Sequence, residues 1–253
     1  MENNAVKRDN RKALPKYLLI LFVAAIFGGV MGFAAGWVGH DQISEVIAAA
    51  VANVLTIAAP WALLATSMVS LAVVLWLYQG AKRLFHGWDG EEETVMDQAD
   101  ERLNWALMLI TVQIILNMFF FAAAVCGQSP WGGIAGVVFF LVSMFLLVVA
   151  QQKIVDLARQ MNPEKQGSIY DVKFKKKWIE SCDEAERKQI GQAAYQAFGV
   201  LNTACPILWL VLIILNFAFN CGILLPAFAV SLLWLIPDAA YFLACIRLGR
   251  RKG

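Results

Sequence analysis

The residue with the clearest potential for chemistry is Asp238, which follows Pro237 inside the last long apolar stretch of the chain. A carboxylate inside a bilayer costs roughly 3 kcal/mol or more, so such an acid is usually paired, protonated or directed at a polar path. In that role Asp238 would carry a proton or bind a cation. In the alternative, structural role it lies near the membrane edge and caps a broken helix or pairs with a polar neighbour. Both interpretations stay open.

A second candidate is a run that combines cations with aromatic rings: Lys173, Phe174, Lys175, Lys176, Lys177 and Trp178. Basic residues beside a membrane are attracted to anionic lipid headgroups by about 1 kcal/mol each. We therefore expect lipid contact at this run, with docking of a protein partner as the alternative. The acidic cluster at 91–93 would complement this run or a basic partner, but a solvated charge run is its default interpretation.

Side-chain amides fall in or beside the apolar stretches, at Asn104, Gln113, Asn117, Asn202, Asn216 and Asn220. In a transporter such groups line a path, whereas in a helical bundle they hydrogen-bond neighbouring helices. The pattern alone does not separate these uses.

Glycines recur at every fourth position in two apolar stretches, namely Gly28, Gly32 and Gly36 in the first stretch and Gly132 and Gly136 in a later one. Glycine lets two helix backbones approach closely, which suits internal packing or contact with a second copy of the chain. We favour internal packing and keep a homodimer as the alternative.

Motifs of enzymes and metal sites are not found. The sequence has no GxSxG, HExxH or phosphate-loop lysine motif, and its five cysteines include no CxxC pair. We therefore expect no catalytic residue, metal or cofactor, and do not expect an enzyme. A net charge of +2 does not indicate nucleic-acid binding. Cys126 and Cys221 are both expected at outer helix ends, so a disulfide between them is an alternative to two free thiols.

The elements that must position these residues are membrane helices. Hydrophobic residues make up 60% of the 253-residue chain and charged residues only 16%, far from the usual soluble composition. A run of about 20 apolar residues spans the bilayer core as a helix. Six such spans are predicted, near 17–38, 57–79, 104–126, 131–151, 198–219 and 223–245. We predict one all-α transmembrane domain over 1–253.

The orientation of the spans follows from the basic residues. All 21 lysines and arginines fall in the N-terminal arm, the loops 80–103 and 152–197, and the C-terminal tail. These segments are therefore expected on the cytoplasmic side, with both termini inside. The protein is predicted to be multi-pass in a bacterial cytoplasmic membrane.

Several shorter elements are also predicted. An amphipathic helix over 39–56, between the first two spans, either lies on the outer surface or runs into the second span. The fourth helix continues past its span until Asn162 and Pro163 stop it. The segment 167–178 is expected to be irregular or extended. Ser181 and Glu184 match a capping box, which predicts a helix leading into the fifth span.

The run from Asn162 to Asp171, the segment Phe174 to Trp178 and the segment Ser181 to Glu186 resemble an uncharacterised family of six-span membrane proteins from Gram-positive bacteria, known only as a domain of unknown function. The acidic loop after Trp88 is similar too. The resemblance implies a bacterial cytoplasmic membrane and carries over no functional residue.

Two functions are therefore considered. The first is a non-enzymatic accessory or regulatory membrane component that binds a cytoplasmic partner, or anionic lipid, through its inner loops, where the distinctive sequence concentrates. The alternative is a transporter, or the permease subunit of an ABC-type system with a partner ATPase, with Asp238 in or near the path. Membrane lipids are expected partners in either case.

Overall fold

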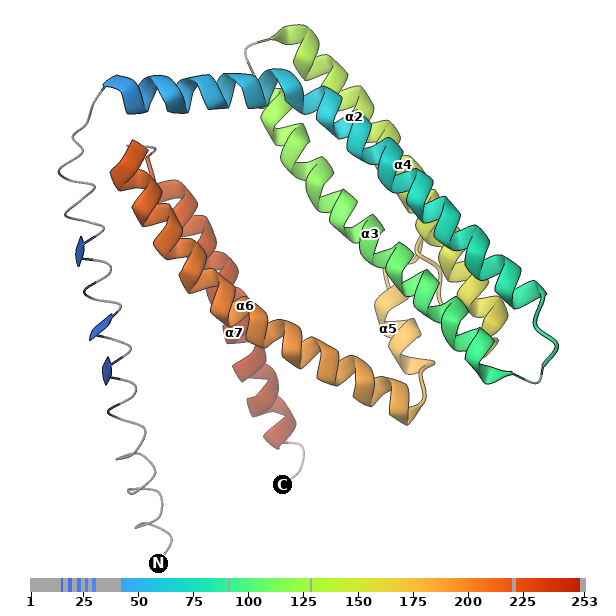
Figure 1. Cartoon of the computed structure of the whole chain (residues 1–253). Coiled ribbons are helices and arrows are strands. Elements are labelled where there is room, and N and C mark those ends of the chain that lie inside the picture. Colours follow the sequence, from blue (N-terminus) through green and yellow to red (C-terminus); the bar gives the residue numbers. More distant parts are fainter. Residues whose placement is uncertain are drawn as a thin grey trace, which may run out of the picture. The chain divides into compact units, whose positions relative to one another are not determined.

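The computed structural model describes residues 42–250, apart from 91, 128, 220 and 221, together with scattered positions between 15 and 30. The described part of the chain is helical and contains no strand. Its helices are α2 (Gln42–His86), α3 (Glu93–Cys126), α4 (Pro130–Met161), α5 (Phe174–Glu180), α6 (Glu184–Phe219) and α7 (Leu224–Arg250) (Figure 1).

Five of these helices are long and apolar enough to cross a membrane. They contain the predicted spans from the second to the sixth. Most of the first span, including Gly28, Gly32 and Gly36, lies outside the residues that can be described, so the count of six spans and the side of each terminus stay predictions. Most large apolar side chains on these helices are exposed, such as Trp76 and Ile115. Lipid solvates such side chains, so their exposure fits a membrane protein.

The helices are longer than the spans within them. With 34 residues, α3 is about 50 Å long, whereas the bilayer core measures about 30 Å. Its charged residues, Glu93, Asp97, Asp100, Glu101 and Arg102, all lie in its first three turns, so we expect this end to project from the membrane. Of the two alternatives for the predicted amphipathic segment, the structure shows the second: residues 42–56 belong to α2 and continue into the second span as one helix. An external position for them stays a prediction.

The chain divides into two compact units, residues 50–192 and residues 1–49 with 193–253. Each is described by itself, and one transmembrane domain over 1–253 stays a prediction. In the first unit, α2, α3 and α4 lie side by side (Figure 1). Their core combines small residues with branched ones, which lets the helices pack closely: Val74, Ala81, Ala99, Leu103, Ala106, Ile110, Leu147, Ala150, Ile154, Leu157 and Met161.

Helix α4 approaches α3 closely at Gly136. A Cβ added to Gly136 would lie 2.7 Å from the Cβ of Ala124, closer than real side chains come. A Cβ at Gly132 would meet Ser129 at an ordinary 3.5 Å. Only Gly136 of this pair is therefore required by the packing of the two helices.

At one end of the 50–192 unit, α2 ends, α3 begins, α4 ends and the loop 162–183 folds. We call this the charged end, and it is the end predicted to be cytoplasmic. Asn162 ends α4 as predicted. The expectation of an irregular segment over 167–178 is wrong in its second half, because Phe174–Glu180 forms α5. Phe174 and Trp178, one turn apart with ring centroids 5.5 Å from each other, share the inner side of this short helix.

In the other unit, the later part of α6 pairs with α7. The Nε1 of Trp234 donates a hydrogen bond of 2.8 Å to Oδ1 of Asn202, and the rings of Phe198 and Tyr241 stack with centroids 4.9 Å apart. Gly222, between the two helices, has a φ of +66°, a left-handed conformation that favours glycine.

Candidate functional site

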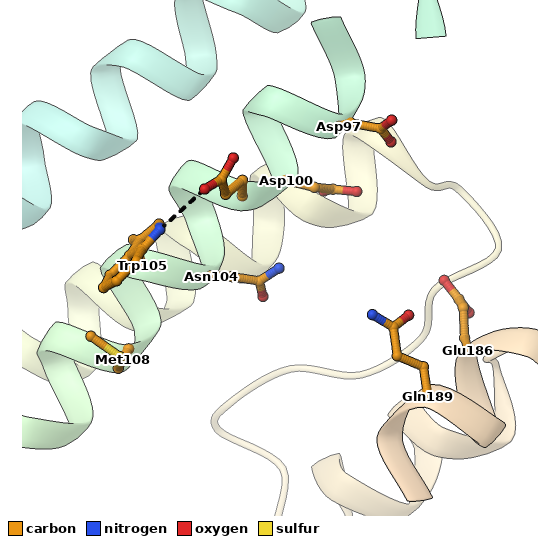
Figure 2. Close-up of a pocket in the computed structure, with 8 residues that line it drawn as sticks. Asp97, Asp100, Asn104, Trp105, Met108, Glu186 and Gln189 are labelled. Carbon is orange, nitrogen blue, oxygen red and sulfur yellow. Dashed lines mark hydrogen bonds between the residues drawn. The ribbon is translucent and has the colours of Figure 1, made fainter. Parts of the chain in front are cut away.

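The charged end contains a cavity of about 560 Å³, between the first turns of α3 and the first turns of α6. The side chains that line it are acidic, amide and apolar: Asp97, Asp100, Glu101, Asn104, Trp105, Met108, Glu186 and Gln189. Asn104 on α3 and Glu186 and Gln189 on α6 point toward one another across it (Figure 2). We call it the acidic pocket. It brings together residues from both of the loops that the sequence marks as cytoplasmic.

Asp100 is an acid of the acidic pocket whose pKa is raised. It precedes the apolar part of α3 and lies outside the predicted span. Burial raises the pKa of Asp100, and the nearby charges of Asp97 and Glu186 raise it further, while Lys165 partly offsets them. The carboxyl groups of Asp97, Asp100 and Glu186 therefore repel one another, and among the described residues the ammonium of Lys165 partly offsets this repulsion. Such a site favours a cation.

That ammonium belongs to Lys165, a residue that is only 8% exposed. Its Nζ donates to the carboxylate of Glu186 and to Sγ of Cys182, the latter at 3.3 Å. The ring centroid of Trp178 lies 5.9 Å away, within cation–π range. Burial opposes the charge of Lys165, but the hydrogen bonds to Glu186 and Cys182 outweigh it, so the pKa of Lys165 is raised. The sequence gives no signal for this residue, since its partners lie 17 and 21 residues later.

Glu186 also closes the capping box of α6. The backbone N–H of Glu186 donates to Oδ1 of Asp183 at 2.7 Å, and the N–H of Asp183 donates to Oε2 of Glu186 at 3.1 Å. The predicted box of Ser181 and Glu184 is therefore wrong by two residues. Ser181 instead turns back, so that its Oγ accepts from the N–H of Gln166 at 3.1 Å and donates to the carbonyl of Trp178.

The same loop is tied to α4 through Gln152. Its Oε1 accepts hydrogen bonds from Oγ of Ser168 at 3.0 Å and from the N–H of Ile169 at 2.8 Å. Its Nε2 donates to Asp156 at 2.7 Å. Residues 162–187 thus form a folded structure on α4 and α6 rather than a loose connection.

The run from Lys173 to Trp178, predicted as one binding segment, has two kinds of residue in this fold: aromatic residues that pack inward and lysines that are exposed. The rings of Phe174 and Trp178 are half-buried, and Phe174 packs against Gly167, where a Cβ would lie 2.8 Å from the ring. Gly167 has a φ of +129°, which also requires glycine. Lys177 pairs with Asp171 at 2.5 Å and lowers the pKa of that carboxyl. Lys173, Lys175 and Lys176 are exposed.

The amides of the third span meet hydroxyl groups of two other helices in the middle of the 50–192 unit. Nδ2 of Asn117 on α3 donates to Oγ of Ser143 on α4 at 2.7 Å, and Oγ of Ser67 on α2 donates to Oδ1 of Asn117 at 3.0 Å. Gln113 donates to Oδ1 of Asn117 at 2.8 Å. All four side chains are buried. Their polar groups therefore hold three helices together.

Asp238 lies in α7 next to Pro237 and is half-buried. Among the described residues it has no hydrogen-bond or ion-pair partner. Cys126, Cys182, Cys205 and Cys245 are free thiols, whereas Cys221 lies outside the described residues, so the pairing of Cys126 with Cys221 stays a prediction. No group of three or more metal-binding side chains occurs among the residues that the structure describes.

The residues that the structure describes are helical, and five of their helices are long and apolar enough to cross a membrane, so the protein belongs to the class of helical membrane proteins. The protein-family model described as "Protein of unknown function (DUF3169)" matches residues 11–245, and the chain belongs to this family. The expected membership of an uncharacterised family is confirmed, while its restriction to Gram-positive bacteria stays a prediction. No curated protein and no solved structure matches the chain.

Proposed function

We propose that the protein is a non-enzymatic accessory or regulatory component of a bacterial cytoplasmic membrane, and that its acidic pocket binds a basic side chain of a cytoplasmic protein partner. Six spans with both termini inside are part of this proposal, supported by the distribution of the 21 basic residues.

The observation that carries the proposal is the convergence of both inner loops on the acidic pocket. Asp97 and Asp100 come from the first loop, and Glu186 comes from the second. Lys165 and the capping box hold Glu186 in place. A lysine or arginine side chain that entered the pocket would relieve the repulsion among the carboxylates, and Trp105 and Met108 would cover its aliphatic part.

Transport receives less support. The amides that would line a path, Gln113 and Asn117, use their polar groups on Ser67 and Ser143. Asp238 has no such partner among the described residues, so it is the residue at which transport can be tested. If Asp238→Asn changed proton-coupled or ion-coupled uptake in membrane vesicles, the transporter interpretation would gain the support it lacks.

The proposal is tested by photo-crosslinking in native membranes, with the crosslinking amino acid at Gln189, which lines the acidic pocket. Wild type should capture a specific cytoplasmic protein. The double variant Asp97→Asn, Asp100→Asn should reduce that capture about tenfold, which corresponds to about 1.4 kcal/mol of binding free energy.

Glu164→Gln is the matched control, because Glu164 is an exposed acid of the same end outside the pocket. Its capture should equal that of wild type. Membrane levels of each variant are compared by immunoblot. Capture of no specific cytoplasmic protein, or equal capture by the double variant, would contradict the proposal.

A further inference from the structure

The loop after α4 folds back toward the membrane. Helix α4 ends at Met161, but Ser168 and Ile169 bond to Gln152, nine residues earlier in that helix. Nine helical residues correspond to about 13 Å along the axis. The predicted fourth span ends at 151, just before Gln152. The turn at 168–169 therefore lies at the level where α4 is predicted to leave the hydrocarbon core, and α5 begins a few residues later, at Phe174.

The outer side of α5 combines lysines with apolar residues. Lys175, Lys176 and Ile179 are exposed residues of α5, and Val172 lies in the turn just before the helix. We call these four residues the α5 face. Val172 is fully exposed and Ile179 is 45% exposed. The opposite side, with Phe174 and Trp178, packs on the folded loop. The α5 face is thus directed away from the protein.

Positive charge on and beside this face is left largely unpaired. Lys177 is also exposed, but it forms an ion pair with Asp171. Lys173 and Lys175 have no ion-pair partner among the described residues. Lys176 approaches Glu180 at 3.7 Å, but both side chains are highly exposed, so this pair adds little. Three lysines therefore lie beside exposed apolar side chains at the depth predicted for lipid headgroups.

We propose that the α5 face, with Lys173 beside it, binds the anionic headgroup surface of the membrane in which the protein is embedded. Lysines flanking apolar residues are typical of elements that lie in the membrane interface. A flat charged surface requires no shaped cavity, and α5 offers none. The membrane helices hold α5 beside the lipid, so binding is intramolecular and a few contacts suffice. The inference does not rest on the proposed function, because the α5 face and the acidic pocket share no residue.

The test uses the full chain in nanodiscs of phosphatidylcholine alone or of phosphatidylcholine mixed with phosphatidylglycerol, and measures amide hydrogen exchange by mass spectrometry. Amides of residues 170–180 should exchange about tenfold more slowly in the anionic discs. High salt should remove most of the difference, because it screens the attraction. Inorganic phosphate added to the phosphatidylcholine discs should not reproduce the slowing.

The triple variant Lys173→Gln, Lys175→Gln, Lys176→Gln should lose the dependence on phosphatidylglycerol. The matched control is Lys82→Gln, Lys153→Gln, Lys188→Gln, which removes the same charge from other exposed positions and should keep the dependence. Unchanged exchange of α2, α3 and α4 verifies the fold in both variants. Equal exchange of 170–180 in the two bilayers would overturn the inference, and so would slowing that persists in the triple variant.

Discussion

Lys165 and Glu186 form an ion pair across 21 residues of sequence, and the Glu186 carboxylate that receives the Lys165 ammonium also accepts the N–H of Asp183 at the start of α6. The Lys165 side chain is 9% exposed and that of Glu186 is 39% exposed. One carboxylate thus fixes both the loop after α4 and the first turn of α6. The shape of the acidic pocket depends on this pair.

Replacing Lys165 should loosen the loop without unfolding the membrane helices. Lys165→Met removes the charge-assisted hydrogen bond to Glu186 and leaves that carboxylate near Asp100 without its cation, at a cost of about 2 kcal/mol. Amides of residues 165–186 should exchange at least about tenfold faster, whereas α2, α3 and α4 stay protected. Lys188→Met is the control, because Lys188 is exposed on α6 with no ion pair among the described residues. Equal effects of the two variants would show that the pair does not hold the loop.

The contribution of the Lys165–Glu186 pair to the stability of the loop should be independent of pH over a wide range. Glu186 accepts a hydrogen bond from Lys165, which lowers the pKa of this carboxyl from its ordinary 4.5. Its contribution is therefore complete above 4.5 and is lost as the pH falls through the lower, folded pKa. The pKa of Lys165 is raised from its ordinary 10.5, so that contribution is complete below 10.5 and is lost as the pH rises through the folded value.

Amide exchange of 165–186, corrected for its intrinsic pH dependence, measures this profile. The contribution of the Lys165–Glu186 pair to the free energy of loop opening should stay constant between those limits and decrease in acid, and Asp100, whose pKa is raised, adds its own dependence in acid. In Glu186→Gln the acid decrease due to this pair should disappear. A loss of protection that begins near neutral pH in wild type would argue against the pair as the group that titrates.

The buried network around Asn117 should be needed for the packing of α2, α3 and α4. Asn117→Ala removes one partner each from Ser67, Gln113 and Ser143, and unpaired polar groups in a bundle core cost free energy. We expect a loss of about 2 kcal/mol, or about 4–8 °C in thermal denaturation in detergent. Thr111→Ala on the same helix is the control, since this hydroxyl is exposed and bonds only to the carbonyl of Leu107. Similar melting of both variants would count against the network.

The two glycines of α4 should respond differently to the same substitution. Gly136→Ala places a methyl group against Ala124 and forces α3 and α4 apart, with an expected loss of about 1–3 kcal/mol. Gly132→Ala meets only ordinary contacts and should melt within about 1 °C of wild type. A comparison of the two melting temperatures decides this, and equal loss in both variants would contradict the close approach at Gly136.

The sequence predicts the membrane helices well because composition and length determine them locally. Runs of apolar residues identified five described helices, and Asn162 with Pro163 identified the end of α4. The loop 162–183 was harder to predict from the sequence, because two overlapping capping patterns occur, Ser181 with Glu184 and Asp183 with Glu186. The contact of Lys165 with Glu186 accompanies the second pattern, and a residue 21 positions away is not visible to a local rule.

The polar network could have been found in part. Ser67, Asn117 and Ser143 all lie near the middle of their predicted spans, so equal depth in the bilayer was a usable signal. The division of the run from Lys173 to Trp178 was not predictable, because it depends on Gly167 and Lys165, which receive Phe174 and Trp178. The acids of the pocket were visible as a charged lead-in to α3, but their meeting with Glu186 requires the folded loop.

The most direct test of the account compares two properties of the single variant Asp100→Asn, its thermal stability and its capture of a partner from Gln189. Burial and the neighbouring charges of Asp97 and Glu186 raise the pKa of Asp100, so its ionised form costs stability at neutral pH, and the uncharged amide removes that cost. We predict a melting temperature about 1–3 °C higher than that of wild type, together with partner capture reduced several-fold. Unchanged capture alongside the higher melting temperature, or a fall in both quantities, would contradict the claim that this carboxylate is retained for binding.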